Sequence, residues 1–119
     1  MREVSELLSG ARFRLFFIRD VETNVARVLT DLRNDKDAKR AFALIQHVAD
    51  NGPPTNEQLC RSIATFRGLF ELKAGRIRIP FYYRPNLQIV LTHVFFKGKR
   101  DQAEYRYADQ LRRQAEGAS

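Results

Sequence analysis

The segment 66–100 most constrains the fold of this chain, because it is patterned as three short strands that follow one another in a meander. Between residues 76 and 84 two sets of side chains alternate: Ile77, Ile79, Phe81 and Tyr83 share one face, and Arg76, Arg78, Tyr82 and Arg84 share the other. A period of two is typical of a strand with one buried and one solvated face. The next strand, over 87–96, is apolar almost throughout, as in the middle of a sheet. We therefore predict a packed sheet whose solvated face is basic and aromatic.

The rest of the chain supplies elements that support this sheet. Before the meander we expect a loose helical turn over 1–10, a strand over 12–19 and a short helical turn over 56–62. Apolar residues at helical spacing predict a helix that begins after Asp20 or Thr23, and a second helix over 38–49 that ends at the Gly-Pro-Pro of 52–54. A basic helix is expected over 101–115, followed by a tail from residue 116.

This order of elements predicts a compact α+β fold in a single domain over residues 1–119. One N-terminal strand and the three-strand meander form an antiparallel sheet, two helices pack on one of its faces, and a C-terminal helix follows. The opposite face is left for binding. Pro80 lies inside an expected strand, where it removes a backbone donor, so we expect a bulge or an outward edge at that point.

The net charge of +7 is carried by one half of the chain. Residues 1–60 hold nine lysines and arginines against nine acidic residues, whereas residues 61–119 hold twelve against five. This asymmetry indicates a polyanion that contacts one part of the molecule, and a nucleic acid fits because clustered cations bind its phosphates with release of counterions. A solubilising surface or an acidic protein partner would show the same asymmetry.

Several classes of site are disfavoured by what the sequence lacks. A single cysteine, Cys60, allows no intramolecular disulfide, and two histidines are too few for a histidine metal cluster. Glu71 is the only carboxylate between residues 61 and 100, which argues against a two-metal nuclease. We expect no metal and no cofactor. No apolar run reaches the length of a membrane span, so we expect no membrane association and a cytoplasmic protein.

Cations alone can still act on RNA, because the 2′-hydroxyl supplies the nucleophile. Arginines and lysines stabilise the charge that develops on the phosphorus centre, and a lysine with a depressed pKa can act as the base. The polar set of the 76–84 strand, which is Arg76, Arg78, Tyr82 and Arg84, fits such a site. Lys73 before it and Lys97 and Lys99 after it fit as well. They fit a non-catalytic RNA-binding face equally well.

Four sequence pieces in order resemble the RelE superfamily of bacterial toxins, in its HigB-like and phage-derived branch. They are NGP at 51–53, GLFELK at 68–73, RIPFY at 78–82 and IVLTHVFFK at 89–97. The resemblance implies the toxin of a type II toxin–antitoxin system, a ribosome-dependent endoribonuclease (an mRNA interferase) that cuts mRNA in the A site without a metal. The partners that it implies are the ribosome, mRNA and a cognate antitoxin, expected to be a helix-turn-helix protein.

The resemblance and the pattern of basic residues together suggest roles for individual residues. The catalytic candidates are Lys73, Arg76, Arg78, Lys97, Tyr82 and His93. The residues expected to bind RNA are Arg84, Lys99, Arg100 and Arg106. His93 matches a recurrent family histidine, but its apolar strand favours a structural role over catalysis. The general acid stays open among Tyr82, Tyr105 and Tyr107, because the family's usual continuation after Lys97 is altered to GKRD.

Two other functions stay open at this point. One is a catalytically inactive protein of RelE fold that binds RNA, the ribosome or only an antitoxin. The other is a relative of the ParE type, which shares the fold but poisons gyrase. A basic strand face disfavours the second, since a toxin directed at a protein does not require it.

Overall fold

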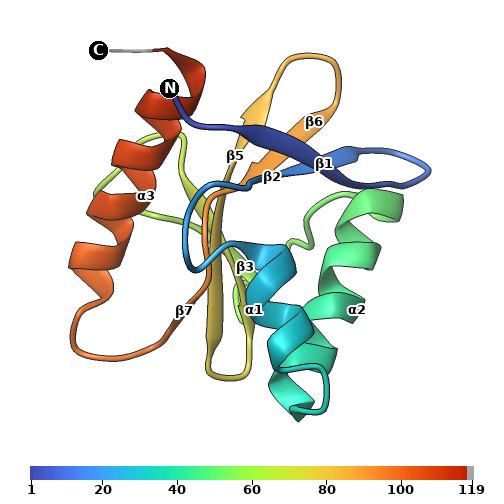
Figure 1. The fold of residues 1–119 in the computed structure, drawn as a ribbon. Helices are drawn as coiled ribbons and strands as arrows, with labels where there is room; N and C mark the ends of the chain where they lie inside the picture. The colour runs from blue at the N-terminus through green and yellow to red at the C-terminus, as the bar shows by residue number, and fades with distance from the viewer. Residues whose placement is uncertain (118–119) are drawn as a thin grey trace.

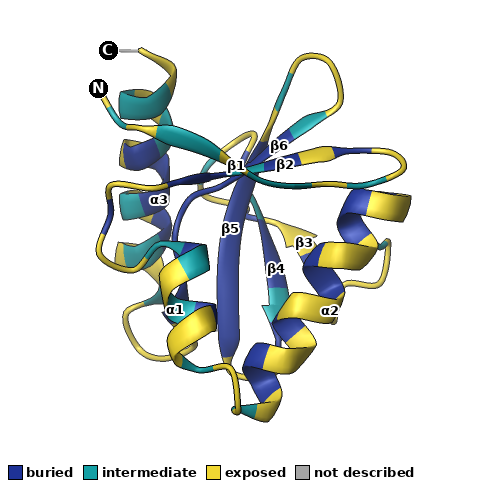
Figure 2. Ribbon diagram, turned by 45° about the vertical axis from the view of Figure 1, so that its right-hand side comes forward, coloured by how far each residue is buried: buried dark blue, intermediate teal, exposed yellow. Residues whose placement is uncertain are grey.

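One mixed sheet runs through the molecule and carries helices on both of its faces (Figure 1). The computed structural model describes residues 1–117. The strands of the sheet are β1 (Val4–Ser9), β2 (Arg14–Ile18), β3 (Cys60–Ser62), β4 (Phe70–Ala74), β5 (Ile77–Arg84), β6 (Gln88–Leu91) and β7 (Phe95–Phe96). They lie in the order β1-β2-β6-β5-β4-β3, and β7 pairs with β5 beyond the end of β6. Strand β5 therefore lies in the interior, and it is buried along most of its length (Figure 2).

Helices α1 (Val25–Asp31) and α2 (Lys36–Asn51) pack on one face of the sheet. The side chain of Asn24 caps α1 by accepting from the Arg27 amide, and Asp35 caps α2 by accepting from two amides. Such caps replace missing backbone partners and stabilise a helix by about 1 kcal/mol. The helix expected to begin after Asp20 or Thr23 therefore begins later, at Val25, because Asn24 is the residue that caps it.

The predicted class, α+β with an N-terminal strand, a meander and two helices on one face, is confirmed. Three local expectations are wrong. The segment 1–10 contains β1 instead of a helical turn, residues 60–62 form β3 instead of a helical turn, and β2 pairs with β6 in parallel. In β1 a bulge between Glu6 and Leu8 breaks the alternation. It leaves Val4, Leu7 and Leu8 at spacings that imitate a helix.

Helix α3 (Asp101–Glu116) covers the face that we expected to be free for binding. Its Tyr105, Ala108 and Leu111 form a buried cluster with Tyr82, Val90 and Phe95 of the sheet. Tyr82 is only 3% exposed and Arg78 only 9%, so the polar face of β5 is not solvated. The apolar stripe of α3 needs an apolar partner, and the sheet supplies it. Of the tail expected from residue 116, Glu116 instead belongs to α3 and Gly117 caps that helix, whereas residues 118–119 lie outside the described residues.

The irregularity expected at Pro80 occurs as a bulge opposite it. Phe81 pairs with Leu91 of β6 and Arg78 pairs with Phe95 of β7, so the β6–β7 side contains one residue more than β5. The backbone amide and hydroxyl of Thr92 both donate to the Pro80 carbonyl, at 2.9 and 3.2 Å. The interruption places a histidine inside the sheet, next to α3.

Candidate functional site

Four cations gather where β3, β4, β5 and β7 meet under the first turns of α3. Arg61 pairs in register with Glu71, Lys73 with Arg78, and Arg78 with Phe95. Since side chains alternate along a strand, Glu71 and Lys73 share the face that α3 covers. Lys97 follows β7 directly and is exposed. We refer to Arg61, Lys73, Arg78 and Lys97 as the cationic cluster.

A fully buried carboxylate holds this cluster together. Glu71 has no exposed surface, and its Oε2 accepts from Arg61 Nε at 2.8 Å and from the Tyr105 hydroxyl at 2.7 Å. Arg61 also donates to the Tyr105 hydroxyl at 3.2 Å, which closes a hydrogen-bonded trio. The other oxygen, Oε1, lies 3.8 Å from Arg78 Nε and has no hydrogen-bond partner among residues 1–117. A buried carboxylate is costly unless it is paired, so Glu71 fixes the positions of the cations around it.

Arg78 is held by the turn that precedes it. Its guanidinium donates to the Gly75 carbonyl at 2.6 Å and to the Ile77 carbonyl at 3.0 Å. With 9% of its surface exposed, the side chain is preorganised and can present only its outer edge to a ligand.

Lys73 is partly exposed, and its pKa is lowered from the usual value. The largest cause is burial, which disfavours the ammonium form, and the nearby charges of Arg61, Arg78 and Lys97 act in the same direction. Glu71 opposes them. The direction of this shift is the one that the base considered in the sequence analysis needs.

Tyr105 is the tyrosine that α3 brings to the cluster. Its pKa is raised, chiefly by burial and next by its hydrogen bond to Glu71, so it stays protonated as a donor. Tyr107 lies elsewhere, edge-on against His93 at a centroid distance of 4.9 Å.

Arg76 lies outside the cluster, at the N-terminal end of α2. Its Nε donates to Asp37 and its outer nitrogen to Asp35, each at 2.9 Å, and its backbone amide donates to Asp37 at 3.1 Å. Its guanidinium also lies 5.6 Å from the centre of the Phe96 ring. These contacts tie the β4–β5 turn to α2 and separate the Arg76 side chain from the cationic cluster, and its catalytic role stays a prediction.

His93 lies in the bulge and is 1% exposed. Its Nε2 lies 3.1 Å from a Glu104 carboxylate oxygen and its Nδ1 3.1 Å from the Thr92 hydroxyl, and Phe95 stacks against it. Burial lowers the pKa of the imidazole, and Glu104 partly offsets the effect. This environment agrees with a structural role, in which His93 attaches the bulge to α3.

Tyr82 and Arg84 lie at the other end of β5. Tyr82 is four residues from Arg78 on the same strand, a separation of about 13 Å at 3.3 Å per residue. Its hydroxyl donates to Glu116 of α3 at 2.6 Å, and Arg84 Nε lies 3.6 Å from the same carboxylate. The structure therefore separates Tyr82 from the cationic cluster.

The remaining predicted RNA-binding residues lie on the surface around the start of α3. Lys99 and Arg100 are exposed on the β7–α3 connection beside Lys97, and Arg106 is exposed on α3. The Gly98 amide donates to Asp101 at 2.9 Å, which shapes this connection. Their contact with RNA stays a prediction.

Arg61 is the site residue that the sequence did not reveal. Strand β3 is three residues long, too short for an alternation to be recognised, and its position was expected to be a helical turn.

Among the described residues, no group of three or more histidine, cysteine or acidic side chains is placed to hold a metal ion. No helix within residues 1–117 has the length and hydropathy to cross a membrane.

Comparison with known proteins identifies the family of this chain. The family described as "Phage derived protein Gp49-like (DUF891)" matches residues 28–113. Among solved structures, the RelB–RelE antitoxin–toxin complex from Methanococcus jannaschii contains a similar chain, with 18% identity and a TM-score of 0.45, covering 66% of this chain and 89% of that one. No curated protein matches.

Proposed function

Because this chain belongs to the Gp49-like family of phage-derived proteins, we propose that it is the toxin of a type II toxin–antitoxin system and acts as a metal-independent, ribosome-dependent mRNA endoribonuclease. The family match agrees with the predicted membership of the phage-derived branch of the RelE superfamily. We propose further that residues 1–119 act as one domain in the cytoplasm, where ribosomes and mRNA are present.

The observation that carries this proposal is the cationic cluster around buried Glu71. It brings together a rigid arginine and a lysine of lowered pKa in the sheet and a protonated tyrosine from α3. Positive charge that is fixed before the reaction stabilises a developing oxyanion without reorganisation, which commonly contributes 100-fold or more to a rate. A surface that only binds RNA needs no such preorganisation.

The reaction follows from the position of the 2′-hydroxyl beside the scissile phosphate. Lys73 removes the 2′-hydroxyl proton, the 2′-oxygen bonds to phosphorus, and Arg78 and Arg61 stabilise the dianionic intermediate. The bond to the 5′-oxygen then breaks. Lys97, exposed at the edge of the cluster, gives that oxygen a proton. The products are a 2′,3′-cyclic phosphate and a 5′-hydroxyl.

The proposed partners are the ribosome with mRNA in its A site, and a cognate antitoxin of the helix-turn-helix kind. They rest on the family resemblance of the sequence. The inactive binding protein is the second candidate, because Arg61 and Arg78 already use donors on Glu71 and on backbone carbonyls. The gyrase poison gains no support from the geometry.

The test is mRNA cleavage in a translating extract, mapped by primer extension. We expect cuts within codons that require ribosomes and decrease about 100-fold or more in Arg78→Ala and Lys97→Ala. Arg27→Ala, which removes an exposed arginine on α1 at the other face of the sheet, is the matched control and should cut like the wild type. If the folded wild type binds ribosomes but leaves mRNA intact, the proposal fails in favour of the inactive binding protein.

A further inference from the structure

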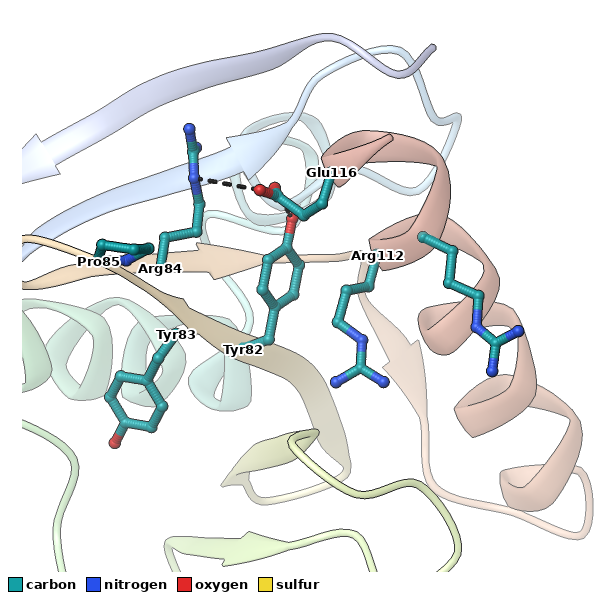
Figure 3. A pocket seen from close by; sticks show the side chains of 7 residues that line it. Tyr82, Tyr83, Arg84, Pro85, Arg112 and Glu116 are labelled. Carbon is teal, nitrogen blue, oxygen red and sulfur yellow. Dashed lines mark hydrogen bonds and ion pairs between the residues drawn. The ribbon is translucent and has the colours of Figure 1, made fainter. Parts of the chain in front are cut away.

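A second basic site lies at the far end of β5, between the β5–β6 turn and the last turns of α3 (Figure 3). It is a pocket of about 400 Å³ whose charged lining residues are Arg84, Arg112, Arg113 and Glu116. Arg84 is six positions further along β5 than Arg78, about 20 Å at 3.3 Å per residue. This pocket is therefore distinct from the cationic cluster.

The pocket already holds an anion supplied by the chain itself. The Glu116 carboxylate accepts from the Tyr82 hydroxyl at 2.6 Å and lies 3.6 Å from Arg84 Nε (Figure 3). Burial and this hydrogen bond raise the pKa of Tyr82, so the hydroxyl stays a donor. The Glu116 side chain is 35% exposed, and solvent weakens partly exposed ion pairs of this kind. An incoming phosphate can accept from the same Tyr82 hydroxyl and pair with the same arginine, so it can replace Glu116 without leaving either group unpaired.

The surface beside the pocket has the composition of an RNA-binding surface. Arg14 of β2 and Arg84 of β5 both lie opposite Gln88 of β6, so the three form a row across neighbouring strands. The guanidinium carbons of Arg14 and Arg84 lie 5.2 and 5.4 Å from the centre of the partly exposed Phe16 ring. Arginines bind phosphates through paired hydrogen bonds, and arginine and aromatic planes provide stacking surfaces for unpaired bases.

We propose that this arginine pocket binds a backbone phosphate of single-stranded RNA, and that Glu116 occupies it as an internal competitor. The phosphate takes the place of the carboxylate, accepts from the Tyr82 hydroxyl and pairs with Arg84, while an adjoining base stacks beside Phe16. The choice of RNA as ligand rests on the proposed function. The site itself rests on the geometry of the pocket.

The experiment measures the affinity of the full chain for a fluorescent single-stranded RNA whose 2′-positions are O-methylated, so that binding is read without cleavage. Anisotropy titrations run from 50 to 200 mM salt for the wild type, Arg84→Ala, Glu116→Gln and the matched control Arg27→Ala. Inorganic phosphate and an acidic peptide are titrated as competitors. Thermal melts check that each variant is folded.

We expect Arg84→Ala to weaken RNA binding about 5- to 10-fold and to reduce the slope of log K against log salt by about 0.7, the value for one phosphate contact on a single strand. Glu116→Gln should tighten binding several-fold, because it removes the competing charge. An equal effect of Arg27→Ala, an unchanged affinity in Glu116→Gln, or no binding by the wild type at 50 mM salt overturns the proposal. So does competition by the acidic peptide alone, which would assign the pocket to a protein partner.

The two proposals fail separately. Cleavage that depends on Arg78 while RNA affinity ignores Arg84 and Glu116 overturns only the arginine pocket. RNA affinity that follows both variants, in a protein that never cuts mRNA on ribosomes, overturns only the endoribonuclease and supports the pocket.

Discussion

The trio of Glu71, Arg61 and Tyr105 leads to a quantitative prediction about stability. Tyr105 is 3% exposed, and Tyr105→Phe removes its hydroxyl, which donates to a carboxylate with no exposed surface. Hydrogen bonds to charged groups contribute about 1.5–3 kcal/mol. The loss falls at the upper part of this range, because Glu71 Oε1 already has no hydrogen-bond partner among residues 1–117 and only Arg61 would then remain on Oε2.

The assay is urea unfolding at pH 7 with a matching thermal melt. For a chain of this length we expect the free energy of unfolding to fall by about 2–3 kcal/mol and Tm to fall by about 5–15 °C. The control is Tyr107→Phe, on the same helix, whose ring packs on His93 outside the trio. Its effect should stay below about 0.5 kcal/mol.

A double-mutant cycle with Glu71→Gln separates the hydrogen bond from general packing. We expect a coupling of about 1 kcal/mol or more between the two positions, because contacting groups in one network are not additive. A loss in Tyr105→Phe no larger than in Tyr107→Phe, or a coupling near zero, would refute the view that Glu71 organises the cationic cluster.

Three further predictions concern single residues. The lowered pKa of Lys73 should give cleavage a rising pH profile whose midpoint lies below the usual lysine value of about 10.4, and a profile in Lys73→Arg identical to the wild type would contradict its role as base. Hydrogen bonds from Arg76 lower the pKa of Asp37, so the stability that Asp37 contributes is present above its unfolded pKa of about 3.9 and is lost as pH falls through the lower folded value. In urea unfolding, Asp37→Asn should therefore lose this dependence of stability on acid pH. A pH profile of stability unchanged from the wild type would refute this role of Asp37. Leu15→Ala removes a fully buried side chain and should cost about 2–5 kcal/mol in urea unfolding, whereas less than 1 kcal/mol would mean that the core collapses around the cavity.

The sequence predicts elements well where the pattern is local and strong. The alternation of 76–84 separates the two faces of β5 correctly but not their exposure, since Arg78 and Tyr82 of the polar face are buried. The helices α2 and α3 lie close to their expected bounds. The spacing of Phe42 places it near the buried stripe of α2, but Phe42 lies at the edge of that stripe and is 46% exposed. Leu44, at the other edge, is buried. Periodicity thus locates an element and one of its faces, but the edge of that face depends on what packs against it.

The candidate site is predicted less well, because its geometry depends on contacts between distant segments. An alternating pattern states which side chains share a face, but not that α3 covers this face or that Asp35 and Asp37 hold Arg76 away from it. Arg61 escapes notice for the same reason, since only the pairing of β3 with β4 brings it to Glu71. Pro80 is the exception. The missing backbone donor is visible in the sequence, and the bulge that follows from it places His93.

The two basic sites are linked by α3, and the two links differ in strength. Tyr105 attaches the helix to the cationic cluster through a buried hydrogen bond. Glu116, eleven residues or about 16 Å further along the helix, attaches it to the arginine pocket through the hydrogen bond from Tyr82 and a partly exposed ion pair with Arg84. A phosphate bound in the pocket takes over both partners of Glu116 and so compensates for opening the second attachment, whereas opening the first leaves the buried Glu71 short of a donor. RNA bound in the arginine pocket can displace the end of α3 while the cluster keeps its geometry. Substitutions at Glu116 should accordingly change RNA affinity without changing the rate of cleavage by ribosome-bound protein, whereas substitutions at Tyr105 should lower both stability and cleavage.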